Sequence, residues 1–145
     1  MMRSLLFPLV LALPVVGCAA FADTQPGSYV APTVTAADAP AVASAVATFA
    51  AMRQPPGPVA VDAPKDGDTA GLADLVASNL RAAGFVVSPT GRNHLAYDVE
   101  GADAHELLLR VTLDDARGAR LLTRAAPDQP LAAQGPFTVT LGAAR

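Results

Sequence analysis

The chain has 145 residues, a formal net charge of −3 and a hydrophobic content of 52%. This length suits one domain with a single core, and the single cysteine excludes any disulfide within the chain. Because 13 acidic residues outnumber 10 basic ones, nucleic-acid binding has little electrostatic support. We therefore expect one domain and no direct contact with nucleic acid.

The first seventeen residues have the parts of an export signal. Arg3 supplies a short basic segment, residues 5–16 are apolar, and small residues follow. A helix of this length reaches roughly 18 Å, whereas the hydrocarbon core of a bilayer is about 30 Å thick. We interpret residues 1–17 as a signal peptide rather than a membrane span.

Cys18 ends the run Val15-Val16-Gly17-Cys18, which resembles a bacterial lipobox. The enzymes that modify such sites require a thiol, because its sulfur becomes a thioether to diacylglycerol. They also require small or aliphatic residues before the cysteine. The sequence therefore predicts a covalent lipid on Cys18, with Val15, Val16 and Gly17 as the recognition residues. We expect no other cofactor.

The cleavage site decides the localisation. Cleavage before Cys18 gives a lipid-anchored protein, and the non-acidic Ala19 favours the outer membrane, with the domain facing the periplasm. The alternative is an ordinary signal cut after Ala22, at Ala20-Phe21-Ala22, which leaves a soluble periplasmic protein. The lipobox is preferred because the apolar run stops at the cysteine.

Residues 18–37 are predicted to form the lipidated cysteine and a flexible tether, because they show no hydrophobic period and contain prolines and glycine. Tyr29, Val30 and Val34 are the apolar points in this segment. We predict that they contact a partner, for example at the edge of its sheet. The alternative is a plain spacer.

Residues 38–145 are predicted to form the globular domain, which begins with a helix over 39–53. Asp38 can cap this helix, and Pro55-Pro56-Gly57 follows its end. Its apolar stripe consists of Val42, Val46, Phe49 and Met52.

A short strand over 58–62 and a polar turn lead to a second helix. Asp68 or Thr69 caps it, and Gly84 supplies a left-handed end. Its buried stripe consists of Leu72, Leu75, Val76, Leu80 and Ala83.

Beyond Gly84 the hydrophobic period changes from helical to two, which is typical of half-buried antiparallel strands. Strands are predicted around 85–87, 95–99, 107–113, 119–124 and 137–141, with a hairpin turn over 114–118. The fold class is therefore α+β. We expect a small single domain with two helices packed on one face of a mostly antiparallel sheet of about five to six strands.

The strands carry a local group of basic residues, interrupted by Asp114 and Asp115. We interpret it as a solvated charged hairpin rather than a nucleic-acid site. Its members are Arg110, Arg117, Arg120 and Arg124.

Residue types that commonly carry catalysis are sparse. His94 and His105 lack the spacing of metal ligands, and the adjacent Asp114 and Asp115 point to opposite sides of an extended chain. No nucleotide-binding or acyl-transfer motif occurs. We therefore expect no metal site and no enzymatic activity.

Four segments, 79–87, 95–98, 107–113 and 135–139, resemble the TrbH family of conjugal transfer proteins over residues 38–140. The resemblance implies an outer-membrane lipoprotein that is a structural or assembly component of a conjugative type IV secretion apparatus. Such a protein acts by anchoring to the outer membrane and docking on other pore proteins. The chain departs from the family pattern after Arg124, where Ala125 and Ala126 replace an expected aromatic residue.

A second hypothesis belongs to another class. An envelope lipoprotein could instead bind a lipid, a glycan or a small ligand in the periplasm. An apolar pocket with converging polar groups would favour this hypothesis.

Overall fold

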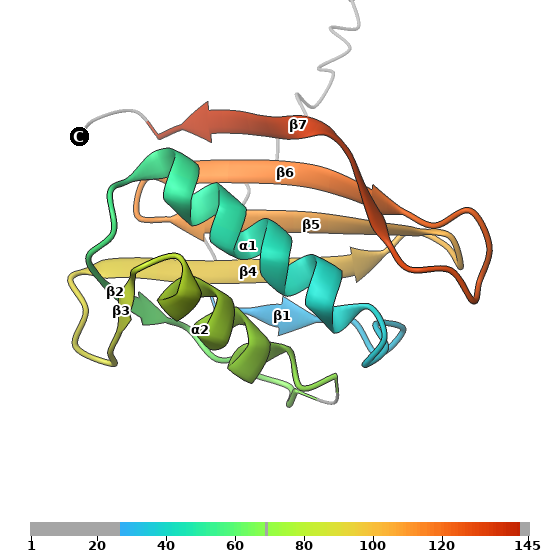
Figure 1. The fold of residues 1–145 in the computed structure, drawn as a ribbon, viewed down its shortest axis with the longest axis horizontal. Coiled ribbons are helices and arrows are strands. Elements are labelled where there is room, and N and C mark those ends of the chain that lie inside the picture. Colours follow the sequence, from blue (N-terminus) through green and yellow to red (C-terminus); the bar gives the residue numbers. More distant parts are fainter. Residues whose placement is uncertain (1–26, 69, 143–145) are drawn as a thin grey trace, which may run out of the picture.

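The computed structural model describes residues 27–68 and 70–142 of the chain. Two helices lie on one face of an open seven-stranded sheet (Figure 1). The helices are α1 (Ala39–Arg53) and α2 (Leu72–Ala82). The strands are β1 (Tyr29–Val30), β2 (Pro58–Val61), β3 (Val86–Val87), β4 (Asn93–Gly101), β5 (Glu106–Leu113), β6 (Ala116–Thr123) and β7 (Ala132–Leu141). This architecture confirms the predicted α+β class.

The strand order is β3-β2-β4-β5-β6-β7, and β1 also pairs with β4. Strands β4 to β7 form an antiparallel meander, whereas β1 and β2 both run parallel to β4. β2 pairs with the start of β4 at Asn93 to Leu95, and β1 pairs with its later part at Asp98 and Val99. β1 and β2 therefore lie end to end along one edge of β4.

The first helix begins and ends where the sequence predicts. Val42, Val46 and Phe49 are fully buried against the sheet. Met52 was expected to share this stripe but is exposed, because it lies in the last turn beside a groove between the helices. Many buried alanines on α1 allow the helix to approach the sheet and α2 closely.

The second helix confirms the predicted carboxylate cap. Asp68 accepts hydrogen bonds from the backbone N–H groups of Leu72, at 2.8 Å, and Ala73, at 2.7 Å. Leu72, Val76 and Leu80 are buried and Leu75 is half-buried, but Ala83 is exposed because the helix ends at Ala82. Gly84 has φ of 92°, the left-handed conformation expected of the residue that stops the helix. Neither of the described helices is long and apolar enough to cross a membrane.

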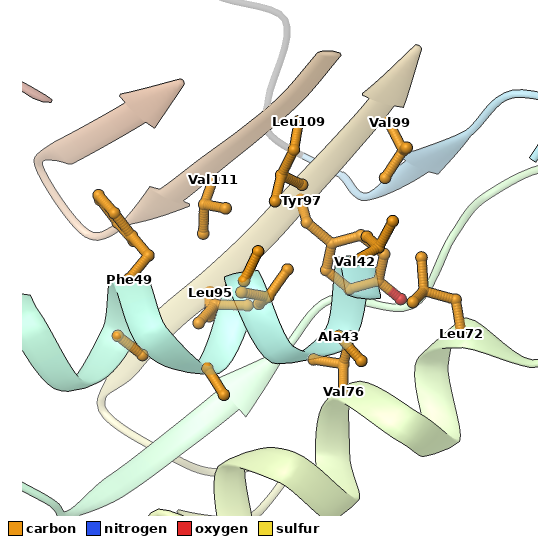
Figure 2. Packing of buried hydrophobic residues seen from close by; sticks show 14 of the residues in the cluster. Val42, Ala43, Phe49, Leu72, Val76, Leu95, Tyr97, Val99, Leu109 and Val111 are labelled. Carbon is orange, nitrogen blue, oxygen red and sulfur yellow. The ribbon is translucent and has the colours of Figure 1, made fainter. Parts of the chain in front are cut away.

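The core lies between the helices and the sheet (Figure 2). The predicted alternation is confirmed, since the inward-facing residues of β4 and β5 are all buried. These residues are Leu95, Tyr97, Val99, Leu107, Leu109, Val111 and Leu113. Phe49 packs on Gly118 of β6, where a Cβ atom would collide with its ring, and its centroid lies 5.1 Å from that of Phe137.

The β5–β6 hairpin is tighter than predicted. Its turn consists only of Asp114 and Asp115, so β6 starts at Ala116 rather than near residue 119. Asp114 adopts φ of 52°, a left-handed conformation that aspartate tolerates. Its carboxylate also accepts a hydrogen bond from the His94 backbone N–H at 2.9 Å, which joins the turn to β4.

Candidate docking surface

The predicted anchor residues, Val15, Val16, Gly17 and Cys18, lie outside the described residues. The described chain begins at Gly27. Because an extended chain advances about 3.5 Å per residue, residues 19–26 can separate Cys18 from the domain by at most roughly 30 Å. If Cys18 carries a lipid, the domain therefore stays close to the membrane surface.

The segment that follows Gly27 is part of the domain rather than of a tether. Ser28 is buried, and its hydroxyl accepts a hydrogen bond from the Tyr97 backbone N–H at 3.1 Å. Its carbonyl accepts one from the Lys65 N–H at 3.3 Å, and the Ala31 N–H donates to the Val99 carbonyl at 2.9 Å. The domain therefore starts before residue 38, which corrects the predicted boundary.

The three predicted partner contacts have different environments. Val30 and Val34 are 8% and 3% exposed and belong to the core of this chain, so they are not available to a partner. The expectation failed for these two residues because β1 pairs with β4 of its own sheet. Tyr29 is 38% exposed and faces the side of the sheet opposite the helices, beside Asp98.

We call this side of the sheet the open face, because neither described helix covers it (Figure 1). Leu108 and Leu121 lie opposite each other there on β5 and β6, and both are half-buried. Tyr29 contributes an exposed aromatic ring at the β1 end. The open face therefore offers a mixture of apolar and polar side chains.

Charged side chains meet on the open face at Arg110. Its Nη1 atom lies 3.0 Å from Glu100 Oε1 and 3.4 Å from Asp98 Oδ2. Burial raises the pKa of the Asp98 carboxyl above its usual value, Glu100 raises it further, and Arg110 opposes both. Since all three side chains are partly exposed, each pair stabilises the fold by no more than about 1 kcal/mol.

The group of four arginines does not form one surface. Arg110 and Arg117 lie on the open face, whereas Arg120 and Arg124 lie on the helix-covered face. The Arg120 guanidinium lies 5.2 Å from the centroid of the Phe137 ring. The alternation of the strand could have indicated that Arg120 and Arg124 lie on the helix-covered face. Each is two residues from the inward-facing Leu122, and residues two apart in a strand share a face.

Asp38 has a different role from the predicted helix cap. Its side chain makes no capping hydrogen bond to α1, and Oδ2 instead accepts from the Thr35 N–H and hydroxyl, both at 2.9 Å. Oδ1 lies 2.7 Å from Arg124 Nη2. This carboxylate therefore links the start of α1 to the segment before it and to the end of β6.

A shallow groove runs between α1 and α2 on the outer side of the helices. Its lining includes Ala47, Ala51 and Met52 from α1, and Asn79 and Ala82 from α2. The described part of the chain contains no group of three or more histidine, cysteine or acidic side chains that could hold a metal ion.

His94 and His105 are both exposed, at the start of β4 and in the β4–β5 loop.

The chain matches no protein-family model, no curated protein and no solved structure.

Proposed function

We propose that the protein is a lipoprotein of the bacterial outer membrane and a structural or assembly component of a conjugative type IV secretion apparatus. The lipid on Cys18 anchors it, and the domain docks on a neighbouring pore protein without catalysing a reaction. The observation that carries the proposal is the run Val15-Val16-Gly17-Cys18, followed after residues 19–26 by a folded domain. The resemblance to the TrbH family supplies the secretion apparatus.

The short segment between Cys18 and the folded domain supports a role in holding the domain at the membrane. A reach of at most roughly 30 Å holds the domain near the inner leaflet of the outer membrane, where the periplasmic parts of a pore complex also lie. Anchoring raises the effective concentration of the domain at that surface, so a modest docking affinity is sufficient.

The open face supports docking on a protein. Tyr29 lies on the first strand after the anchor and presents an aromatic ring of the kind enriched in protein interfaces. Arg110, Asp98 and Glu100 add charges of both signs nearby. Such a mixture suits a protein surface of complementary charge better than the interior of a bilayer.

The anchor is tested by following labelled palmitate and the mature N-terminus in cells. We expect the wild type to incorporate the label and to begin at Cys18, and Cys18→Ala to incorporate none. A conservative Ala19→Ser variant serves as the control and should be labelled like the wild type. Label in Cys18→Ala, or a mature N-terminus at Asp23, would contradict the proposal.

Docking is tested by co-purification of the lipidated protein with pore components after cross-linking of the envelope. We expect Tyr29→Glu to lose the partner and to lower plasmid transfer, whereas Tyr29→Phe retains both. Unchanged transfer after deletion of the gene, with no co-purifying transfer protein, rules out a role in conjugation.

The groove between α1 and α2 is the feature that favours the second candidate, an envelope lipoprotein that binds a lipid, glycan or small ligand. Its alanine and methionine lining could accept an acyl chain. Native mass spectrometry of the purified protein would detect such a ligand. Loss of that ligand in Ala82→Trp, which fills the groove from an exposed position, would support binding there.

A further inference from the structure

β7 forms one edge of the sheet, and no described residue pairs with its outer side (Figure 1). It is ten residues long, whereas β3 at the opposite edge has only two. β7 contains no charged residue. Sheets commonly protect long edges with charges, so an uncharged edge of this length is open to pairing with another strand.

The second half of β7 presents a regular set of backbone groups that pair with no described residue. Leu141 lies opposite Ala116 in β6, and the next residue, Gly142, donates its N–H to the Asp115 carbonyl at 2.8 Å. Backbone groups alternate in direction along an antiparallel strand. The N–H and C=O groups of Phe137, Val139 and Leu141 are therefore directed away from β6.

The side chains of the same segment are incompletely covered. Val139 is 36% exposed and Leu141 is 60% exposed, and both share the helix-covered face with Phe137. Thr138 and Thr140 lie on the open face. The segment thus combines a hydrogen-bonding edge to which no described residue is paired with exposed apolar surface.

The order of residues 137–141 is complementary to itself. If two copies run antiparallel about Val139, then Val139 faces its counterpart, Phe137 faces Leu141, and Thr138 faces Thr140. Apolar residues meet apolar ones, threonines meet threonines, and no charges of the same sign are opposed, which favours cross-strand pairing. On one side the regular strand is interrupted just before this segment, by Pro136 and by Gly135 with its φ of 64°.

We propose that the outer edge of β7 pairs with the same edge of a second copy of this chain, about a two-fold axis at Val139. The pairing joins the two sheets into one continuous sheet and covers Val139 and Leu141. It goes beyond the proposed function, because the open face around Tyr29 stays available to a pore protein. A two-fold contact of this kind is closed and stops at a dimer.

Disulfide trapping tests the pairing. In the full chain carrying Cys18→Ser, the variant Val139→Cys has a single thiol, and the proposed pair places its Cα about 5.5 Å from that of its counterpart. That separation is within the range of a disulfide, so we expect a cross-linked dimer to form at least about tenfold faster than in the control. The control is Val86→Cys in the same background, since Val86 is an exposed valine on the opposite edge strand.

Equal rates for Val139→Cys and Val86→Cys would overturn the proposal. So would a mixed disulfide between position 139 and a different envelope protein, without any dimer of this chain, when the experiment is done in cells.

Charge at the axis gives a second test. Val139→Lys in the Cys18→Ser chain places two ammonium groups opposite each other, so we expect sedimentation equilibrium to show dimer for the Cys18→Ser parent and monomer for this variant. Val86→Lys should remain dimeric, and the circular dichroism of both variants should match that of the parent. A monomeric parent, or a dimer that persists in Val139→Lys, contradicts pairing through β7. The outcome is independent of palmitate labelling, so the anchor and the dimer fail or succeed separately.

Discussion

Arg124 at the end of β6 and Asp38 at the start of α1 form an ion pair of 2.7 Å that is largely withdrawn from water, with side chains 11% and 1% exposed. The pair connects the helix to a strand of the sheet that it covers. Because an isolated buried charge is strongly unfavourable, each partner depends on the other.

We expect Arg124→Ala to lower the free energy of unfolding by about 3–5 kcal/mol, because it leaves the Asp38 carboxylate buried without its partner. Urea unfolding followed by circular dichroism measures the change. The double variant Asp38→Ala/Arg124→Ala should be less destabilised than the sum of the single variants. Arg92→Ala, at an exposed position, is the control and should change stability by no more than about 0.5 kcal/mol. If Arg124→Ala behaves like this control, the ion pair does not stabilise the domain.

Gly118→Ala should destabilise the domain by about 1–3 kcal/mol, because the added methyl group enters the space of the Phe49 ring. The smaller side chain in Phe49→Leu should relieve part of this strain, so Gly118→Ala should cost less in that background. Gly57→Ala is the matched control, since its nearest neighbour would be a carbonyl oxygen 3.9 Å away. Thermal unfolding of the wild type, the two single variants, their double variant and Gly57→Ala shows whether the packing of Phe49 requires glycine at position 118.

Asp68→Ala should lower the free energy of unfolding by about 0.5–2 kcal/mol, because two N–H groups at the start of α2 lose their acceptor. Asp68→Asn keeps a side-chain oxygen and should retain most of the stability. Asp66→Ala changes an exposed carboxylate in the same loop and serves as the control. Equal stability of Asp68→Ala and Asp66→Ala, measured by urea unfolding, would show that the cap is dispensable.

Tyr97 should make the domain less stable at alkaline pH. Burial raises the pKa of its phenol in the folded state, with Asp68 as a smaller cause, whereas the pKa in the unfolded chain is about 10. The unfolded state therefore ionises first as pH rises, so the stability linked to this group is complete below about pH 10 and is lost above it.

Urea unfolding at about pH 9 and about pH 11 measures this effect, and Tyr97→Phe should show a smaller decline between them. At neutral pH the same variant should change stability by less than about 1 kcal/mol, because the Tyr97 hydroxyl has no hydrogen-bond partner among the described residues. An identical alkaline decline in both proteins would exclude Tyr97 as the cause.

The elements with strong local patterns could be predicted from the sequence. The helix over 39–53 has the bounds expected from its apolar spacing and from the prolines after it, and Asp68 caps α2 as expected. The alternating residues of β4 and β5 are buried because a period of two places one set on the core side of a sheet. These features depend on neighbours within a few residues, so local chemistry is sufficient.

The candidate surface could be predicted only in part. The sequence predicts partner contacts at Tyr29, Val30 and Val34 alike, but only Tyr29 is exposed, whereas Val30 and Val34 lie in the core. A strand of two residues has no period to detect, and its pairing with β4 depends on residues far along the chain. Recognising β7 as an edge strand also requires the strand order, which local sequence patterns do not reveal.

The sequence by itself determined the two helices, the alternating strands, the α+β class and the expectation of a lipid on Cys18, because each rests on short-range spacing or on a short motif. The tertiary structure decided where the domain begins, which arginines are covered by the helices and which strand ends the sheet. It also decided that the Asp38 carboxylate pairs with Arg124 instead of capping the helix as the sequence predicts. These outcomes depend on burial and pairing between distant segments, whose free energy exceeds the local preference of any single residue.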